Sequence, residues 1–151
     1  MNVVIDASIA LDLFTTPGKS PVKLRAISLF EAIADGTVIA SVPDHLSIEV
    51  ANEALKYQRR YSTLVKRRQA IEFLGHLEAF PIDYVGYVLN PKRVGEWAAA
   101  MNCSAFDAVY IHFARELDTN LATSHKGQKA AAAGFKVPLW GVPGSTDSAA
   151  P

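Results

Sequence analysis

The sequence of 151 residues contains a single cysteine, Cys103, so no disulfide can form within the chain. This excludes a small disulfide-bonded secreted scaffold and favours a reducing compartment. No apolar run approaches the roughly 20 residues that a membrane-spanning helix needs. The first apolar run follows Met1 almost directly, with no basic segment or cleavage site before it. We therefore expect no signal peptide, no membrane association and a cytoplasmic location.

Net charge is also missing, because 15 acidic and 15 basic residues cancel. A nucleic-acid site would therefore depend on local clustering of charge rather than on the overall field. The glycine motifs of nucleotide-binding folds are absent: neither G-x-G-x-x-G nor G-x-x-x-x-G-K occurs. There is no serine nucleophile elbow, and Ser8 stands where a phosphoaspartyl-transfer site would carry a second aspartate after Asp6. These enzyme classes are excluded.

Half of the residues are hydrophobic, and short apolar runs alternate with amphipathic segments. We predict strands at residues 3–5, 37–42, 80–83, 120–123 and 136–140, the third being weak because it contains Pro81. Helical periodicity and caps predict helices at 7–14, 21–35, 43–60, 63–78, 91–101, 105–117 and 126–133. This alternation predicts one α/β domain over residues 1–140, with three layers (α/β/α) around a central, mainly parallel sheet of four to five short strands. Residues 141–151 are predicted to be a disordered tail.

Two aspartates lie at positions where an α/β sheet binds ligands. Asp6 follows the buried run Val3–Ile5, which places a carboxylate at the carboxyl end of a strand. Taken alone, Asp6 is more simply the N-cap of the next helix. Asp107 lies in an apolar helical segment, three residues after Ser104, which matches a capping box. A carboxylate in a first helical turn can also face the crevice at a strand end, so capping and ligand binding are compatible.

Glu49 and His125 are further candidates. Glu49 lies on the helix after the second strand, where Asn52 could hold it, although alone it is more simply a solvent-facing glutamate. His125 follows the fourth strand, where an active-site loop would leave the sheet; the alternative is a loop histidine without a ligand. The other histidines show no metal-ligand spacing and are interpreted as surface or hydrogen-bonded polar residues: His45, His76 and His112.

A basic cluster stands out in this neutral chain. Six cations occur within thirteen residues that contain no acid: Lys56, Arg59, Arg60, Lys66, Arg67 and Arg68. Such a cluster could meet a phosphate backbone, or it could be a solvated helix face. Without an acidic cluster nearby, the second interpretation is the simpler one. Four more aspartates are interpreted as caps or surface charges: Asp12, Asp44, Asp83 and Asp118.

Four segments together resemble the PIN-domain family, and within it the VapC-type toxins of prokaryotic toxin–antitoxin pairs. They are VVIDASIAL at 3–11, VPDHLSIEVANEAL at 42–55, CSAFDAVYIHFAREL at 103–117 and NLATSHKG at 120–127. The resemblance covers residues 1–140 and implies a PIN-like domain that acts as a Mg²⁺- or Mn²⁺-dependent ribonuclease. It implies that Asp6, Glu49 and Asp107 fill three acidic metal positions. The fourth acidic position, normally an aspartate, is His125 here.

The donor chemistry agrees with this, because hard cations such as Mg²⁺ prefer oxygen ligands. The predicted function is hydrolysis of RNA phosphodiester bonds by the toxin of a toxin–antitoxin pair. The resemblance implies a homodimer and a small antitoxin that covers the acidic site, and the basic cluster would contact RNA or this antitoxin. Two alternatives stay open: a PIN-like RNA- or protein-binding module weakened at His125, and an RNA-processing nuclease without an antitoxin.

Overall fold

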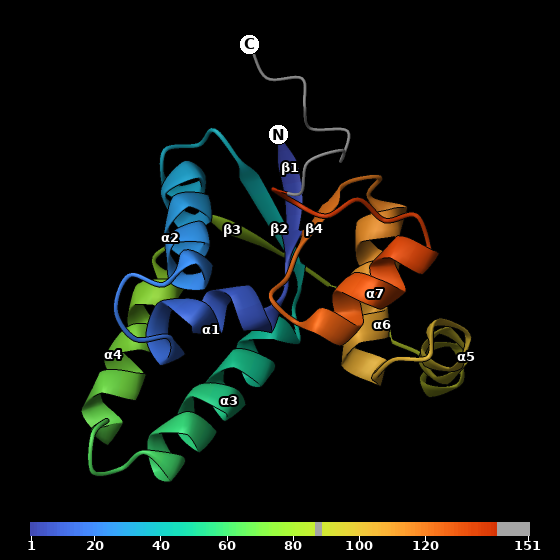
Figure 1. Cartoon of the computed structure of the whole chain (residues 1–151). Coiled ribbons are helices and arrows are strands. Elements are labelled where there is room, and N and C mark those ends of the chain that lie inside the picture. Colours follow the sequence, from blue (N-terminus) through green and yellow to red (C-terminus); the bar gives the residue numbers. More distant parts are fainter. Residues whose placement is uncertain (87–88, 142–151) are drawn as a thin grey trace.

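A computed structural model describes residues 1–86 and 89–141 of the chain. A four-stranded sheet lies at its centre, with the strand order β3-β2-β1-β4 and parallel pairing throughout (Figure 1). The strands are β1 (Asn2–Ile5), β2 (Ile39–Pro43), β3 (Ile82–Val85) and β4 (Asn120–Ala122). All carboxyl ends therefore meet at one edge of the sheet, as the sequence predicts for a parallel α/β domain.

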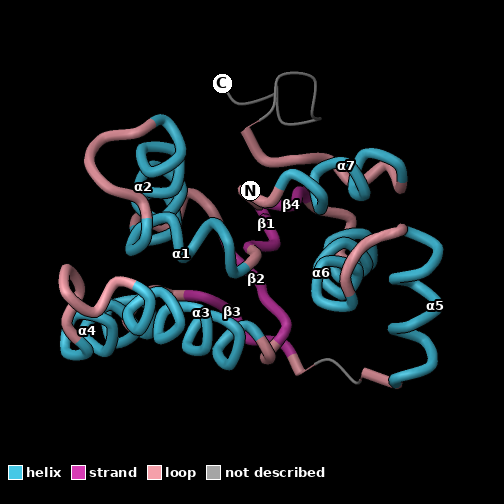
Figure 2. Tube along the Cα trace, turned by 60° about the horizontal axis from the view of Figure 1, so that its bottom comes forward, coloured by secondary structure: helices cyan, strands magenta, loops and turns pink. Residues whose placement is uncertain are grey.

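Helices cover both faces of this sheet. In the described part of the chain they are α1 (Ala7–Thr15), α2 (Pro21–Ala34), α3 (Leu46–Arg60), α4 (Arg67–Glu78), α5 (Pro91–Met101), α6 (Ala105–Glu116) and α7 (Lys126–Gly134). Helices α1 to α4 pack together on one side, and α5 to α7 pack together on the other (Figure 2). The predicted three-layer α/β/α class is confirmed. No helix among the described residues is long and apolar enough to cross a membrane.

The central strand β1 is buried because it has helices on both faces. Val3, Val4 and Ile5 are completely inaccessible, which explains why the strand is a continuous apolar run rather than an alternating one. Its neighbours β2 and β4 fix its register through the pairs Val3↔Ala40 and Val4↔Leu121. The chain must therefore emerge from β1 at the centre of the carboxyl edge, which is where Asp6 stands.

The strand predicted at 80–83 is displaced to Ile82–Val85, and the helix predicted from Pro43 begins only at Leu46, because Pro43 still pairs with Val85 in the sheet. Two further predicted elements are also wrong in their extent. The predicted strand at 136–140 is reduced to one isolated bridge between Leu121 and Leu139, because Lys136 is left-handed (φ 58°) and Pro138 has no N–H to donate. The helix predicted from residue 63 begins only at Arg67. A turn precedes it, and Gln58 on α3 donates a side-chain hydrogen bond to the Val65 carbonyl in this connection (3.2 Å). The predicted tail lies outside the described residues from 142 onward.

Two buried glutamines differ in hydrogen bonding, which allows the energetic cost of an unpaired buried amide to be tested. Gln128 on α7 is fully buried, and neither its amide nitrogen nor its amide oxygen has a hydrogen-bond partner in the described part of the chain. Gln58 is buried too but keeps its bond to Val65. An unpaired buried amide costs about 1–3 kcal/mol. We expect Gln128→Met to raise the free energy of unfolding by about 1 kcal/mol in urea titrations. Gln58→Met should lower it, and an equal loss in both variants would contradict the assignment.

Candidate acidic site at the carboxyl edge of the sheet

Asp6 is the buried centre of the site, with only 5% of its surface exposed. It caps α1 as predicted: the Ser8 amide donates to Oδ1 (2.5 Å) and the Ser8 hydroxyl donates to Oδ2 (3.0 Å). Burial raises the pKa of Asp6, and the negative charge of Asp107 raises it further, whereas hydrogen bonds from Thr123 and Ser8 lower it. A carboxylate this deeply buried beside another is costly, and the Asp6 side chain has no cationic partner in the described structure.

Hydroxyl groups connect the ends of β1 and β4 around Asp6. The Ser8 and Thr123 hydroxyls lie 3.2 Å apart, and the Ser124 amide donates to the Ser8 hydroxyl (2.9 Å). The His125 amide donates to the Thr123 hydroxyl (3.0 Å), and the Ser124 hydroxyl donates to Asp12. Ser8, Thr123 and this role of Asp12 were not predicted from the sequence. The available signal was a small hydroxyl residue within three positions of the end of each of these two buried strands.

Asp107 faces the same edge from the first turn of α6. Its amide donates to the Ser104 hydroxyl (3.1 Å), and that hydroxyl donates to Asp107 Oδ2 (2.7 Å), so the predicted Ser104 cap is confirmed. His125 immediately precedes α7, and its Nδ1 lies 3.0 Å from Asp107 Oδ1. The Asp107 side chain is 13% exposed and the His125 side chain 56% exposed. The histidine therefore closes the solvent side of the aspartate.

Glu49 reaches the site from α3. The Tyr110 hydroxyl donates to Glu49 Oε2 (2.8 Å), which places Tyr110 in the role expected of Asn52; Asn52 instead donates to Glu53 (3.2 Å). Burial raises the pKa of Glu49 to about 7, the Tyr110 hydrogen bond lowers it, and the charges of Asp6, Asp107 and Glu53 raise it. Tyr110 was missed, although it lies three residues after Asp107 on one helix face.

The raised pKa of Glu49 makes stability depend on pH. Because the folded protein holds this proton up to about pH 7 and the ordinary carboxyl value is 4.5, the contribution of Glu49 is most favourable below 4.5 and is lost as the pH rises toward 7. We expect Glu49→Gln, which cannot ionise, to increase the melting temperature relative to the parent at about pH 8 but not near pH 4.5. Tyr110→Phe removes the donor that lowers this pKa and should move the crossover to higher pH. A gain from Glu49→Gln that is the same at every pH would contradict the assignment.

His45 corrects one interpretation. It is not a surface or hydrogen-bonded histidine: both ring nitrogens are buried and have no hydrogen-bond partner in the described structure. Its ring lies 5.1 Å from Tyr110 and 6.0 Å from Phe106, beside an apolar pocket of about 420 Å³. Burial lowers the pKa of His45, which keeps the imidazole neutral. It therefore supports the packing behind Tyr110 rather than carrying charge.

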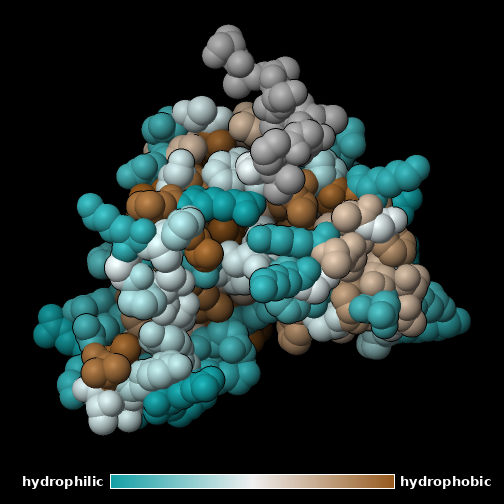
Figure 3. Space-filling view, viewed as in Figure 1, coloured by the Kyte–Doolittle hydropathy of each residue, from teal (hydrophilic) through white to brown (hydrophobic). Residues whose placement is uncertain are grey.

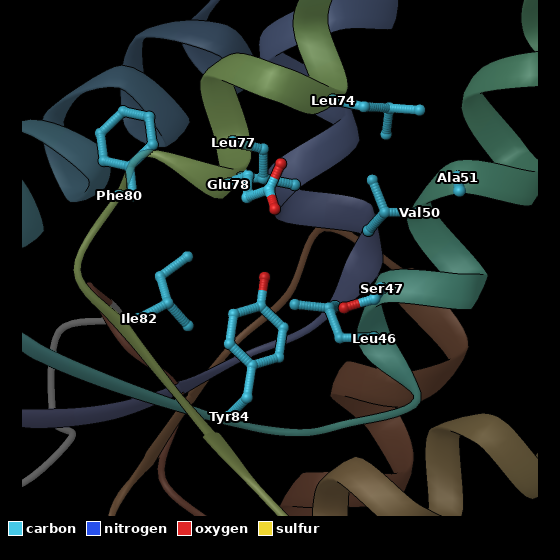
Figure 4. A pocket seen from close by; sticks show the side chains of 10 residues that line it. All are labelled: Leu46, Ser47, Val50, Ala51, Leu74, Leu77, Glu78, Phe80, Ile82 and Tyr84. Atoms are coloured by element: carbon cyan, nitrogen blue, oxygen red, sulfur yellow. The ribbon is translucent and has the colours of Figure 1, made fainter. Parts of the chain in front are cut away.

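The six cations of the basic cluster do not lie together beside the acidic site. Lys56 and Arg60 line a groove beside α1, while the other four cations lie outside that groove on the exposed surface: Arg59, Lys66, Arg67 and Arg68. Lys56 forms an ion pair with Glu53 (2.5 Å), and Arg68 forms one with Glu72 (2.6 Å). A separate pocket of about 550 Å³ between α3, α4 and β3 contains none of the predicted site residues (Figure 4).

The donor set of the site consists of carboxylate oxygens, which suits Mg²⁺ or Mn²⁺. Among residues 1–86 and 89–141, however, no three or more histidine, cysteine, aspartate or glutamate side chains form a ready metal-binding group. Asp107 is hydrogen-bonded to Ser104 and His125, and Glu49 to Tyr110. The chemistry of the donors fits a hard cation, and binding it would require these side chains to turn toward one another.

Comparison with known proteins supports the fold. Neither a protein-family model nor a curated protein matches the sequence. Among solved structures, the chain is similar to the crystal structure of PAE2754 from Pyrobaculum aerophilum. The TM-score is 0.59 at 15% sequence identity, over 87% of this chain and 84% of that chain. A likeness at this identity establishes a shared three-layer fold over most of both chains.

Proposed function

We propose that the protein is a metal-dependent endoribonuclease that hydrolyses RNA phosphodiester bonds. The observation that carries this proposal is that three carboxyl groups from three different elements, Asp6, Glu49 and Asp107, interact electrostatically at one edge of the sheet. Their charges raise the pKa values of Asp6 and Glu49. Carboxylates that disfavour one another's ionised state are stabilised by a cation, and such a cation also attracts a phosphodiester. The PIN-domain resemblance points to the same activity.

In this proposal each side chain has a distinct task. Asp6 and Asp107 hold Mg²⁺ or Mn²⁺, and Glu49 joins them once it loses its proton. When bound, the cation would polarise the phosphodiester and lower the pKa of an attacking water. Ser8 and Thr123 orient Asp6 through their hydroxyls. His125 donates from Nδ1 to Asp107, which leaves Nε2 to accept a proton or to donate one to the leaving oxygen.

The proposed partners are RNA, a small antitoxin protein that covers the acidic site, and a second copy of this chain. Apolar exposure beside the acids supports a covering partner. Ile48 and Phe106, each adjacent in sequence to a site acid, are 76% and 56% exposed. The proposed location is the cytoplasm. The pairing of His125 with Asp107, in place of a fourth acid, favours a second candidate: a binding module without catalysis.

A metal titration distinguishes these candidates. Purified protein is incubated with a labelled single-stranded RNA in EDTA and then with increasing Mg²⁺ or Mn²⁺. A nuclease cleaves only after metal is added, and the same metal raises its melting temperature. A binding module retains the RNA without cleaving it at any metal concentration. Cleavage that persists unchanged in EDTA would refute the metal-dependent mechanism.

A further inference from the structure

A groove leads away from the acidic site between α1 and α3. It has a volume of about 530 Å³ and is bordered by residues 8–15 of α1 and 53–61 of α3 and the turn that follows; we call it the α1–α3 groove. Both helices begin at the carboxyl edge of the sheet and run outward from it (Figure 1). Ser8, whose hydroxyl binds Asp6, lines the groove. The groove is therefore continuous with the site.

One face of α3 links the acids to the outer part of this groove. Glu49, Glu53, Lys56 and Arg60 are spaced by four, three and four residues, which places them in one row along the helix. The row spans about 16 Å at 1.5 Å per residue, enough for a few nucleotides. Hydrophilic side chains dominate the surface over α3 in the space-filling view (Figure 3).

The outer part of the groove carries an aromatic platform. The ring centroids of Tyr57 and Tyr61 lie 4.7 Å apart with the rings tilted by 47°, and Phe14 packs edge-on against Tyr57 with centroids 5.7 Å apart. The Tyr57 hydroxyl donates to the Thr15 carbonyl (3.1 Å), which fixes this ring between the two helices. Tyr61 is more exposed, and the Arg60 guanidinium lies 5.5 Å from its ring centroid.

The charge in the groove changes from acidic near the acidic site to basic at its outer end. Asp12 and Glu53 lie toward the acids, and Glu53 already engages Lys56. Arg60 forms no ion pair with any residue in the described part of the chain. It is therefore the cation in the groove that can accept a phosphate without first breaking a salt bridge.

We propose that the α1–α3 groove binds single-stranded RNA next to the scissile phosphate, with unpaired bases stacked on Tyr61 and Tyr57 and a phosphate on Arg60. This inference rests on the proposed function, because it assigns the path of that substrate. Stacking on an aromatic face requires unpaired bases, and an arginine beside the rings binds the backbone. An amphipathic protein helix would need a continuous apolar stripe, whereas Leu11 is the only aliphatic side chain among the described residues that line the groove.

Three variants test this proposal, with Arg59 as the matched control. Arg59 has the same charge as Arg60 and is adjacent to it on α3, but it lies outside the groove. Binding of a short fluorescein-labelled single-stranded RNA is measured by anisotropy in EDTA, where no cleavage should occur. We expect Tyr61→Ala to weaken binding about 5- to 100-fold and Tyr61→Phe to restore it, since stacking needs only the ring. Arg60→Ala should reduce the slope of log affinity against log salt by about 0.7, and Arg59→Ala should change affinity less than about twofold.

Two results would overturn the groove assignment. One is equal weakening by Arg59→Ala and Arg60→Ala with no effect of Tyr61→Ala, which would mean a diffuse basic surface. The other is equally tight binding of duplex RNA, which cannot stack on Tyr61. The two proposals fail in distinguishable ways. RNA binding that depends on Tyr61 without cleavage in any metal refutes the nuclease alone, whereas cleavage with binding insensitive to Tyr61 refutes the groove alone.

Discussion

Replacing Asp6 by asparagine is expected to reduce RNA cleavage by about a hundredfold or more, because even residues that only support metal ligands are worth about 10–100-fold. The fold should survive the change. Asparagine is as good an N-cap as aspartate and can still accept the hydrogen bond from the Ser8 amide. Removing a buried charge that lies beside Asp107 should leave the melting temperature unchanged or raise it. The increase in melting temperature on adding Mg²⁺ or Mn²⁺ should be lost.

Asp107→Asn should show the same combination of lost cleavage and retained fold. Asp83→Asn is the matched control, because Asp83 is an exposed aspartate on the edge strand β3. The Asp83→Asn protein should cleave RNA at the parent rate. Initial rates with labelled RNA and thermal melts with and without metal measure both effects. If Asp6→Asn cleaves at the parent rate in the same metal, the assignment of the acidic site is wrong.

His125→Asp is expected to increase Mg²⁺-supported cleavage by roughly tenfold, provided that weak metal binding limits the parent. A neutral imidazole can bind Mn²⁺ but suits the harder Mg²⁺ poorly, so the parent should favour Mn²⁺. An aspartate at this position, next to Asp107, would add one negative charge and an oxygen ligand. Without metal the same variant should be less stable, because it exchanges a 3.0 Å hydrogen bond for repulsion between carboxylates.

His125→Ala separates the possible roles of this histidine. Equal loss of cleavage in His125→Asp and His125→Ala would mean that the imidazole itself transfers a proton or binds the phosphate. No change in either variant would mean that the three acids suffice. Rates in Mg²⁺ and in Mn²⁺, compared at one pH, distinguish these outcomes.

Local signals predicted the elements and the two aspartates well. A β-branched and apolar run followed by Asp6 predicts both a buried strand and an N-cap, and Ser104 before Asp107 predicts a helix start. Both features depend on residues within a few positions of each other. The prediction of a strand at 136–140 was wrong for a local reason as well. The left-handed backbone of Lys136 and the missing N–H of Pro138 prevent continuous strand pairing there.

The pairings that form the site could not be predicted in the same way. The Tyr110 hydroxyl reaches Glu49 across 61 residues of sequence, and Ser8 reaches Thr123 across 115. These contacts exist because β1 lies between β2 and β4 and because α6 packs beside β1. Strand order follows from the packing of the whole domain. The sequence alone therefore could not indicate that Tyr110, rather than the nearby Asn52, would form the hydrogen bond to Glu49.

The short bridge at Leu139 has a further consequence for the solubility of the domain. Strand β4 is three residues long and lies at the end of the sheet order, so its outer side would be an open edge able to recruit strands from other molecules. Leu121 instead receives and donates backbone hydrogen bonds across the segment 138–140, and Arg25 holds this segment through the Trp140 carbonyl and ring. Residues 138–140 therefore cover this edge against pairing with strands of other molecules, and shortening the chain before Leu139 would expose the strand that leads into Thr123 and His125.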